Sequence, residues 1–468
     1  MSTPELQQID QVVQDAAIAA EFWATSSATV RSALLEGLAS GLEAHQSALV
    51  ELADEETHLG AARLNGEVAR TAFQLRGFAA EVRAGVPFAA VDDAAVSGAP
   101  PVGRPRLTRV SEPLGPVAMF SASNFPFAFS VLGGDTASAL AAGCPVVVKA
   151  HSGHPKLSRA VFKVAQGVLA SLELPSGLLG LVGGASREAG NYLVKHPKIE
   201  AIAFTGSFHG GTALWRAANE RMKPVPFFGE LGSINPLVAL PGILEHEGEH
   251  LAKTLAASIV MGCGQFCTSP GVIVLLAGQA TDRFVASLSS ALQPLETHAM
   301  LTPAMRKGFD HGVAQLEQAN QARVVFQPGI DGQGPAPRLF EVNAKAFIEE
   351  KSLREEVFGP CAVIIKADSA AQVIEVLHAI GGTLTATLWG FEEADEQARS
   401  IYREARKISG RVLFSGVPTG VAVTHAQQHG GPWPASTQPQ TTSVGYAAMQ
   451  RFLRPVALQD APSWALDQ

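Results

Sequence analysis

The sequence predicts an α/β protein with a doubly wound parallel sheet and more than one domain. Short apolar runs such as 117–120, 145–149 and 180–182 alternate with helical patterns, which is typical of parallel strands joined by helices. A chain of 468 residues is too long for one ordinary core, so two or three domains are expected. The 47% of hydrophobic residues and the 45 glycines fit a compact fold rather than a disordered or fibrous chain.

The net charge and the cysteines of the chain indicate which binding partners and which cellular compartment to expect. A formal net charge of -8 disfavours nucleic acid and anionic membranes, which both reward a basic face. The four cysteines, at 144, 263, 267 and 361, show no disulfide framework, which favours a reducing compartment. The N-terminus lacks the basic region and apolar core of an export signal, and no apolar stretch reaches ~18 residues. We therefore expect a cytoplasmic protein without nucleic-acid or membrane partners.

The first part of the chain predicts helices followed by a strand. Apolar residues recur at helical spacing through residues 1 to about 85, with Ser27 as an expected N-cap and Gly60 as an expected C-cap. The prolines and charges of 105–113 indicate an edge strand. Residues 115–149 then form a strand, helix and strand, which implies a right-handed crossover between parallel strands.

Two α/β units follow from the remaining pattern. In the first, Thr205, Gly206 and Ser207 join a strand to a helix, and such a helix N-terminus is a suitable seat for a diphosphate. The alternative is an ordinary Gly/Ser-rich turn. The first unit also has strands at 180–182 and 199–205 and helices at 157–172 and 212–221; the second has strands at 272–276, 361–365 and 411–414 and helices at 280–292 and 371–380.

A glycine-flanked loop at 262–270 carries the main candidate for chemistry. Cys267 lies there between a helix-like run at 249–261 and a β-branched run at 272–276, which indicates a nucleophile on a tight turn. A free thiol has a pKa near ~8.5, so it needs a base. Glu230, between glycines and apolar residues, is the candidate, because burial would raise its pKa toward that of a general base. The alternatives are a small core cysteine and a turn carboxylate.

A zinc-like pattern occurs at 246–250, where His246 and His250 flank a glutamate. A glycine interrupts the helix that would align the two imidazoles, and no third ligand is evident. Cys263 is expected to pack in the core. We therefore expect no metal.

Together with a third stretch, these motifs carry a resemblance. An Asn-Phe-Pro segment at Asn124, a Glu-Leu-Gly segment at Glu230 and a Gly-Gln-x-Cys segment at Cys267 occur in this chain order. The set resembles the aldehyde dehydrogenase superfamily over nearly the whole chain. Residues 133–140, 205–208 and 429–434 carry a closer resemblance to the NADP-preferring branch of α-ketoglutarate semialdehyde (2,5-dioxopentanoate) dehydrogenases and a bacterial long-chain fatty aldehyde dehydrogenase.

The resemblance implies a domain plan and a homo-oligomer, either a homodimer or a homotetramer. The implied domains are a Rossmann-type cofactor domain at 1–95 and 117–232, an α/β catalytic domain at 233–425, and a β oligomerisation arm at 96–116 and 435–460.

The resemblance also implies roles for three residues. Cys267 would attack an aldehyde, and the Asn124 side chain with the Cys267 backbone N–H would stabilise the oxyanion, where one donor is worth roughly 10²- to 10³-fold in rate. Glu230 would activate the water that hydrolyses the thioester. The alternative for Asn124 is a turn amide that bonds its own backbone.

Cofactor contacts follow in the same way. The resemblance places Lys149 at the adenosine ribose and Glu356 and Phe358 at the nicotinamide ribose. Ser152 stands where NAD-specific relatives have a glutamate, whose carboxylate ~4 Å from a 2′-phosphate would cost about 4 kcal/mol. Arg187 matches an arginine that contacts this phosphate, although it also fits a helix-face charge. NADP is therefore expected, with NAD possible.

The substrate is less determined. Phe127, Phe129, Phe266 and Trp433 would line an apolar channel to the thiol, or they are ordinary core aromatics. A 2-oxo acid semialdehyde needs a cationic anchor, and the arginines are too scattered to nominate one. We expect oxidation of 2,5-dioxopentanoate to the acid through a thiohemiacetal and a thioester. The alternatives are a medium- or long-chain fatty aldehyde dehydrogenase, a CoA-acylating dehydrogenase or acyl transferase, and a non-catalytic relative.

Overall fold

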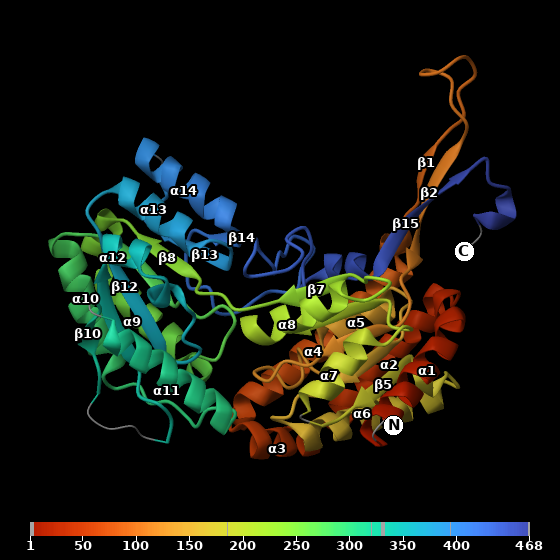
Figure 1. The fold of residues 1–468 in the computed structure, drawn as a ribbon, viewed down its shortest axis with the longest axis horizontal. Helices are drawn as coiled ribbons and strands as arrows, with labels where there is room; N and C mark the ends of the chain where they lie inside the picture. Colours follow the sequence, from red (N-terminus) through yellow and green to blue (C-terminus); the bar gives the residue numbers. More distant parts are fainter. Residues whose placement is uncertain (1–3, 185, 320, 329–332, 394, 467–468) are drawn as a thin grey trace.

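The protein, seen here in a computed structural model, consists of one parallel and one mostly parallel sheet, with their helices, and a projecting antiparallel arm (Figure 1). The structure describes residues 4–184, 186–319, 321–328, 333–393 and 395–466. No helix among these residues is long and apolar enough to cross a membrane.

The first sheet has five parallel strands in the order β5-β4-β3-β6-β7. They are β3 (Val117–Phe120), β4 (Val146–Lys149), β5 (Leu179–Val182), β6 (Ala201–Thr205) and β7 (Phe227–Glu230), with helices α5 (Gly134–Ala141), α6 (Pro155–Ser171), α7 (Arg187–Lys195) and α8 (Phe208–Asn219). Every residue of β3 and β4 is buried, as expected for strands covered on both faces. The predicted doubly wound sheet is confirmed.

Four N-terminal helices pack beside this sheet: α1 (Pro4–Ala24), α2 (Ala28–Ala44), α3 (Gln46–Thr57) and α4 (Ala61–Arg83). Ser27 caps α2 by accepting a hydrogen bond from the Val30 N–H, as predicted. The prediction for Gly60 is wrong, because His58 ends α3 in the left-handed region and Gly60 is the N-cap of α4.

The second sheet has seven strands in the order β10-β11-β12-β9-β8-β13-β14, all parallel except β10. They are β8 (Pro236–Ala239), β9 (Val272–Leu276), β10 (Arg323–Phe326), β11 (Arg338–Asn343), β12 (Cys361–Ala367), β13 (Thr383–Trp389) and β14 (Ser409–Leu413). Its helices are α9 (Pro241–Val260), α10 (Gln279–Leu292), α11 (Pro303–Gln318), α12 (Ala344–Glu349), α13 (Ala370–Ile380) and α14 (Glu396–Ile408).

The zinc-like pattern lies inside α9. The expectation that glycine interrupts a helix here is wrong, since α9 runs through Gly248, which is buried against the core. His246 and His250 are exposed to solvent.

The arm is a three-stranded antiparallel sheet of β1 (Val91–Asp93), β2 (Leu107–Pro113) and β15 (Leu453–Gln459), and it projects from the body (Figure 1). Its order is β1-β2-β15, so β2 is central and the expectation of an edge strand is wrong. Residues 91–93, assigned above to the cofactor domain, pair with β2 in the arm. Within the described residues, six short 3₁₀ helices complete the fold: η1 (Val86–Phe88), η2 (Ser176–Leu178), η3 (Met261–Gly264), η4 (Lys351–Arg354), η5 (Tyr446–Phe452) and η6 (Ser463–Ala465).

The chain crosses directly from one large sheet to the other. β7 ends at Glu230 and β8 begins at Pro236, so the carboxyl edge of the first sheet faces the amino edge of the second. A returning segment after β14 holds this junction, because the Leu231 N–H donates to the Ala435 carbonyl at 2.8 Å and the Thr437 N–H donates to the Gly229 carbonyl at 3.0 Å.

Candidate active site

The candidate residues gather at the junction of the two sheets. Asn124 follows β3, and Glu230 ends β7, so both lie at the carboxyl edge of the first sheet. Cys267 precedes β9 and Glu356 precedes β12, at the amino edge of the second. In doubly wound sheets, ligands bind outside the carboxyl ends of the strands, where the strand order reverses. Here that position is between β3 and β6.

Left-handed backbone shapes the cysteine loop. Gly262, Cys263 and Gly264 have φ values of 56°, 60° and 64°, so the chain turns sharply after α9. A side chain on Gly264 would meet the Gly359 backbone at 2.2 Å, which explains the glycine. Cys263 is fully buried in the second-sheet core, as predicted.

Asn235, which the sequence analysis missed, ties this loop to the second sheet. Its Nδ2 donates to the carbonyls of Cys267 at 2.8 Å and Ser269 at 3.0 Å. Its Oδ1 accepts from the Thr385 hydroxyl at 3.1 Å. Because Asn235 is fully buried, these bonds fix the backbone that carries the thiol.

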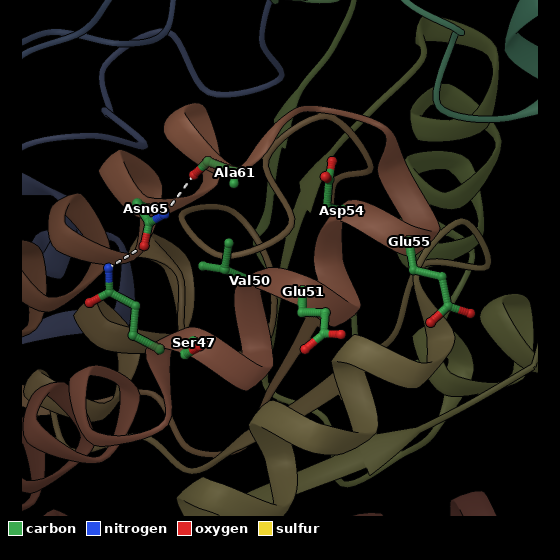
Figure 2. Close-up of a pocket in the computed structure, with 8 residues that line it drawn as sticks. Ser47, Val50, Glu51, Asp54, Glu55, Ala61 and Asn65 are labelled. Atoms are coloured by element: carbon green, nitrogen blue, oxygen red, sulfur yellow. Dashed lines mark hydrogen bonds between the residues drawn. The ribbon is translucent and has the colours of Figure 1, made fainter.

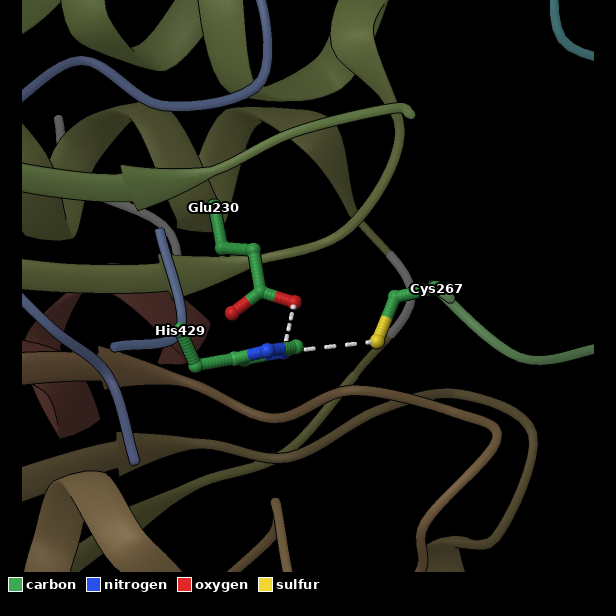
Figure 3. Close-up of side chains that lie close together, drawn as sticks. All are labelled: Glu230, Cys267 and His429. Atoms are coloured by element: carbon green, nitrogen blue, oxygen red, sulfur yellow. Dashed lines mark hydrogen bonds and ion pairs between the residues drawn. The ribbon is translucent and has the colours of Figure 1, made fainter. Parts of the chain in front are cut away.

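The Cys267 thiol, the Glu230 carboxylate and the His429 imidazole form one cluster (Figure 3). His429 Nε2 lies 3.0 Å from Glu230 Oε1 and 3.5 Å from Cys267 Sγ. The Ser443 hydroxyl donates to Glu230 Oε2 at 2.6 Å, so both carboxylate oxygens have partners. The ligand atoms of the three residues lie within 4.8 Å of one another.

The expectation that burial raises the pKa of Glu230 is wrong. Burial does push this pKa upward, but the charge and hydrogen bond of His429, with the bonds from Ser443 and Cys267, outweigh it and lower the pKa. Glu230 is 4% exposed. It is therefore a buried carboxylate held in its ionised form.

The same carboxylate disfavours the thiolate. Cys267 is partly accessible as a residue, but protein groups crowd its sulfur. Burial and the neighbouring Glu230 raise the pKa of the Cys267 thiol well above its ordinary value, while Arg70 lowers it to a smaller extent. In this state the Cys267 thiol is protonated.

His429 is a second site residue that the sequence analysis did not nominate. Residues 429–434 contribute to the family resemblance, but no role was predicted for the histidine among them. The signal in the sequence is a histidine directly before two glycines in the loop-rich tail. The ring is 2% exposed, and its Nδ1 has no hydrogen-bond partner among the described residues. Its Nε2 instead faces Glu230, whose ionised carboxylate can only accept a hydrogen bond. We infer that Nε2 carries the proton and donates it to Glu230.

Asn124 lies beside the cysteine loop. Its Nδ2 donates to the Gln265 carbonyl at 2.9 Å, two residues before Cys267. Its own carbonyl accepts from Arg63 Nη2 at 2.6 Å. The side-chain amide is thus directed at the cysteine loop rather than at its own turn, and Arg63 holds the backbone that carries it.

The carboxyl edge of the first sheet suits a dinucleotide. Lys149, 8% exposed, donates from Nζ to the Gly184 carbonyl at 2.5 Å, and burial lowers its pKa. Thr205 has a buried hydroxyl that finds no partner in the described part of the chain, and Ser207 caps α8 by accepting from the Gly210 N–H. Ser152 and Arg187 are exposed after the neighbouring strands β4 and β5. Gly206 is exposed between Thr205 and Ser207. An orphaned hydroxyl, an exposed helix N-terminus and an exposed cation fit a phosphorylated cofactor.

Glu356 faces this edge from the other side. A Cβ atom on Gly232 would lie 2.5 Å from Glu356 Oε2, so the carboxylate packs directly against this glycine. The carboxylate also accepts a hydrogen bond from the Ser233 backbone. The residue as a whole is exposed, but protein atoms surround its carboxylate, and this desolvation raises its pKa to about 7. Glu356, Phe358, Ser233 and Phe266 line one recess at the junction.

Two of the four aromatic channel residues are not placed as expected. The prediction that Phe127 lines a channel is wrong, because this side chain is 2% exposed and packs in the core between the first sheet and its helices. Trp433 is 47% exposed and its ring lies 5.5 Å from Phe208 and 5.4 Å from Trp215, so it packs on α8. The partly buried Phe129 and Phe266 instead flank Phe125, at 5.3 and 5.1 Å between ring centroids.

A second recess, of about 730 Å³, lies between α3 and α4 and contains none of these groups (Figure 2). Its lining includes Glu51, Asp54 and Glu55 beside Ser47 and Asn65. We assign it no part in the chemistry.

Two α/β sheets that meet at a cysteine loop, with a dinucleotide-type edge opposite, have the architecture of an NAD(P)-dependent oxidoreductase. The chain belongs to the aldehyde dehydrogenase family, whose family model matches residues 2–431. The resemblance inferred from the sequence is therefore confirmed, and the protein is an aldehyde dehydrogenase.

Two similar proteins are α-ketoglutaric semialdehyde dehydrogenases. The chain is 42% identical over 440 residues to "Alpha-ketoglutaric semialdehyde dehydrogenase 2" of Azospirillum brasilense, covering 92% of this chain and 83% of the relative. It is 38% identical over 466 residues to "Alpha-ketoglutaric semialdehyde dehydrogenase" of Acinetobacter baylyi, covering 98% and 88%.

Solved structures share the fold at low identity. A methylmalonate-semialdehyde dehydrogenase from Oceanimonas doudoroffii matches with a TM-score of 0.82 at 18% identity, covering 99% of this chain and 92% of that one. Proline utilization A of Bradyrhizobium japonicum matches with a TM-score of 0.82 at 24% identity, and the match spans 98% of this chain but 45% of that longer chain. These matches confirm the predicted fold class.

Proposed function

We propose that this protein oxidises 2,5-dioxopentanoate, which is α-ketoglutarate semialdehyde, to 2-oxoglutarate with NADP. The observation that carries the substrate is the identity of 42% and 38% to two α-ketoglutaric semialdehyde dehydrogenases over nearly the whole chain. Domain boundaries near 95, 117 and 232 and the arm segments 96–116 and 435–460 are part of the same proposal.

In the proposed reaction, Cys267 gives its proton to the neighbouring Glu230 carboxylate as Sγ attacks the aldehyde carbon, which gives a thiohemiacetal alkoxide. Glu230 passes this proton to solvent before it takes one from the attacking water. The oxygen that becomes negative receives hydrogen bonds from Asn124 Nδ2 and the Cys267 backbone N–H. Bound NAD(P) supplies the acceptor for the hydride. Loss of that hydride from the former aldehyde carbon leaves a thioester on Cys267. Water then breaks the carbon–sulfur bond, releasing the acid and the thiol.

Glu230 and His429 have distinct parts in this proposal. An Nε2–H bound to Glu230 cannot also accept the proton of Cys267, so His429 is a positioning residue rather than the base. Glu230 is ionised and lies beside the thiol, so it can take a proton from the attacking water. Ser443 and His429 hold the carboxylate in one orientation for that transfer.

The preference for NADP over NAD is proposed from the charges of the side chains near the expected 2′-phosphate. Ser152 follows β4 and Arg187 begins α7 after the adjacent strand β5, so a serine and an exposed arginine flank the same end of the sheet. A 2′-phosphate would meet a cation there and no carboxylate from residue 152. Lys149, Thr205, Gly206 and Ser207 would hold the rest of the adenosine diphosphate, and Glu356 with Phe358 the nicotinamide ribose.

A fatty aldehyde is the second candidate substrate, because Phe125, Phe129 and Phe266 form an aromatic wall near the thiol. Acyl transfer to CoA is disfavoured by a buried, ionised Glu230 suited to activate water.

A substrate panel tests the proposal. We expect kcat/KM with NADP to be higher for 2,5-dioxopentanoate than for pentanal or decanal by more than about tenfold, because a site with polar groups rejects analogues that leave them unpaired. The same substrate with NAD gives the cofactor preference, and free CoA in the assay shows whether acyl-CoA forms. A preference for decanal, or release of acyl-CoA, would contradict the proposal.

A further inference from the structure

One face of α4 points charged side chains at the site. Arg63, Glu67 and Arg70 are spaced four and three residues apart, which places them on the same side of a helix. Each contacts the segment 124–129, which carries Asn124 and the aromatic wall. The exposed opposite face has ordinary surface ion pairs, such as Arg76 with Glu43.

Two of the three side chains are committed to the fold. Glu67 is 5% exposed, and its Oε1 accepts from the N–H groups of Phe127 at 2.8 Å and Ala128 at 3.0 Å. Arg63 donates to the Asn124 carbonyl, and its guanidinium lies 5.0 Å from the Phe125 centroid and 4.8 Å from the Phe266 centroid. Both therefore hold the Asn124 segment and the cysteine loop in place.

Arg63 Nη1 and Glu67 Oε2 are also buried without a partner among the described residues, but each is a single atom of a side chain that is otherwise bonded. Arg70 differs because one whole edge of its guanidinium is unpaired. Its Nε and Nη2 are both buried without a hydrogen-bond partner, and Arg70 forms no ion pair with a residue that the structure describes. These two nitrogens lie on the same edge of the planar group, the edge that pairs side-on with a carboxylate. A buried donor pair without an acceptor is costly and calls for a missing partner.

The position of Arg70 relates it to the reacting sulfur. Its guanidinium lies 5.8 Å from the Phe129 centroid, and the Phe129 ring lies 6.5 Å from the His429 ring, which contacts Cys267. One aromatic ring therefore separates Arg70 from the nucleophile cluster. An aldehyde at Cys267 would extend a short chain along Phe129 toward the guanidinium.

We propose that Arg70 binds the terminal carboxylate of the substrate through Nε and Nη2, so that the enzyme selects short aldehydes with an acid group at the far end. This inference rests on the proposed function and supplies the cationic anchor that the sequence alone did not identify. Phe129 forms the wall for the chain between the two ends. The partner class is a carboxylate rather than an apolar tail, because an alkyl chain would leave both donors unpaired.

The test compares 5-oxopentanoate with pentanal, which have equal chain length and differ in the carboxylate. In Arg70→Met, we expect the ratio of kcat/KM for 5-oxopentanoate over pentanal to fall by about 10- to 150-fold, the range for hydrogen bonds to charged groups. Arg70→Lys keeps the positive charge but cannot donate two parallel hydrogen bonds, so its kcat/KM ratio should lie between those of the wild type and Arg70→Met. Arg76→Met, an arginine of the same helix in a surface ion pair, should keep the wild-type ratio.

A binding measurement separates recognition from folding. Glutarate should inhibit pentanal oxidation competitively in the wild type, and its inhibition constant should rise in Arg70→Met by a similar factor. An unchanged substrate ratio in Arg70→Met, or equal glutarate inhibition, overturns the role of Arg70. A wild type that prefers 5-oxopentanoate to 2,5-dioxopentanoate, with the ratio still lost in Arg70→Met, instead overturns the proposed substrate and supports the anchor.

Discussion

At the scale of single residues, the thiol lies in surroundings that suppress its reactivity. Burial comes first and the Glu230 charge second in raising the pKa of Cys267. A resting enzyme with a protonated sulfur is protected from oxidation, because the thiolate is the form that reacts. Moving Glu230 or adding a positive charge nearby would release the nucleophile.

The variant Glu230→Gln separates the two effects of this carboxylate. Without the negative charge, the pKa of Cys267 should fall, so more thiolate is present at pH 8. Each unit of pKa gives tenfold more thiolate but lowers its nucleophilicity, so iodoacetamide should alkylate Cys267 about threefold faster per unit. The wild-type rate should keep rising with pH beyond about 9.

The same variant should lose the water-activating base. Steady turnover should fall by about 10²- to 10⁴-fold, while one equivalent of reduced cofactor still forms in a rapid burst. Stopped-flow absorbance measures the burst, and peptide mass spectrometry locates the alkylated cysteine. Full steady activity in Glu230→Gln would refute the role of Glu230, and slower alkylation at pH 8 would refute the charge effect.

At the scale of elements, two loops from different strands lock together. The cysteine loop precedes β9, and the loop with Glu356 precedes the neighbouring strand β12. They touch at Gly264 and Gly359, where no side chain fits. The distance between the nucleophile and Glu356 is thus set by backbone contact rather than by flexible side chains.

Gly264→Ala should therefore damage the site. A left-handed residue other than glycine costs about 1–3 kcal/mol, and the new methyl group also meets the Gly359 backbone. In a chain of 468 residues, we expect the thermal midpoint to fall by about 1 °C per kcal/mol, together with a loss of activity. Calorimetry and steady-state kinetics measure both.

Gly66→Ala is the matched control. Gly66 lies in the interior of α4, and an alanine methyl group there would enter open space, so this substitution should stabilise the protein by about 0.5–1 kcal/mol. If Gly264→Ala behaves like Gly66→Ala, the two loops are not locked at this contact.

At the scale of the whole molecule, the sequence predicts the framework better than the site. Apolar runs such as 117–120 and 146–149 are visible because both faces of these strands are buried. Strand β13 was not predicted, because its alternating threonines are polar residues even though the whole strand is buried. Arg70 and Glu67 resemble a solvated helix face in sequence, and only the fold turns that face inward. His429 and the lowered pKa of Glu230 depend on a contact across 199 residues of chain.

The arm gives the molecule a surface that a single chain does not cover. All of β1 is exposed and β15 has no buried residue, so this small sheet buries little on its own. Trp464, just after β15, is 76% exposed, and exposed tryptophans are typical anchors of protein interfaces. We expect sedimentation equilibrium to give two or four times 48.9 kDa.

Trp464→Asp should shift this mass toward one chain, because a charge replaces an apolar anchor. Met222→Asp is the control, since Met222 is fully exposed between α8 and β7 and lies outside the arm. It should sediment like the wild type. A wild-type mass of 48.9 kDa at micromolar concentration, or equal dissociation of both variants, would mean that the arm does not join copies of this chain.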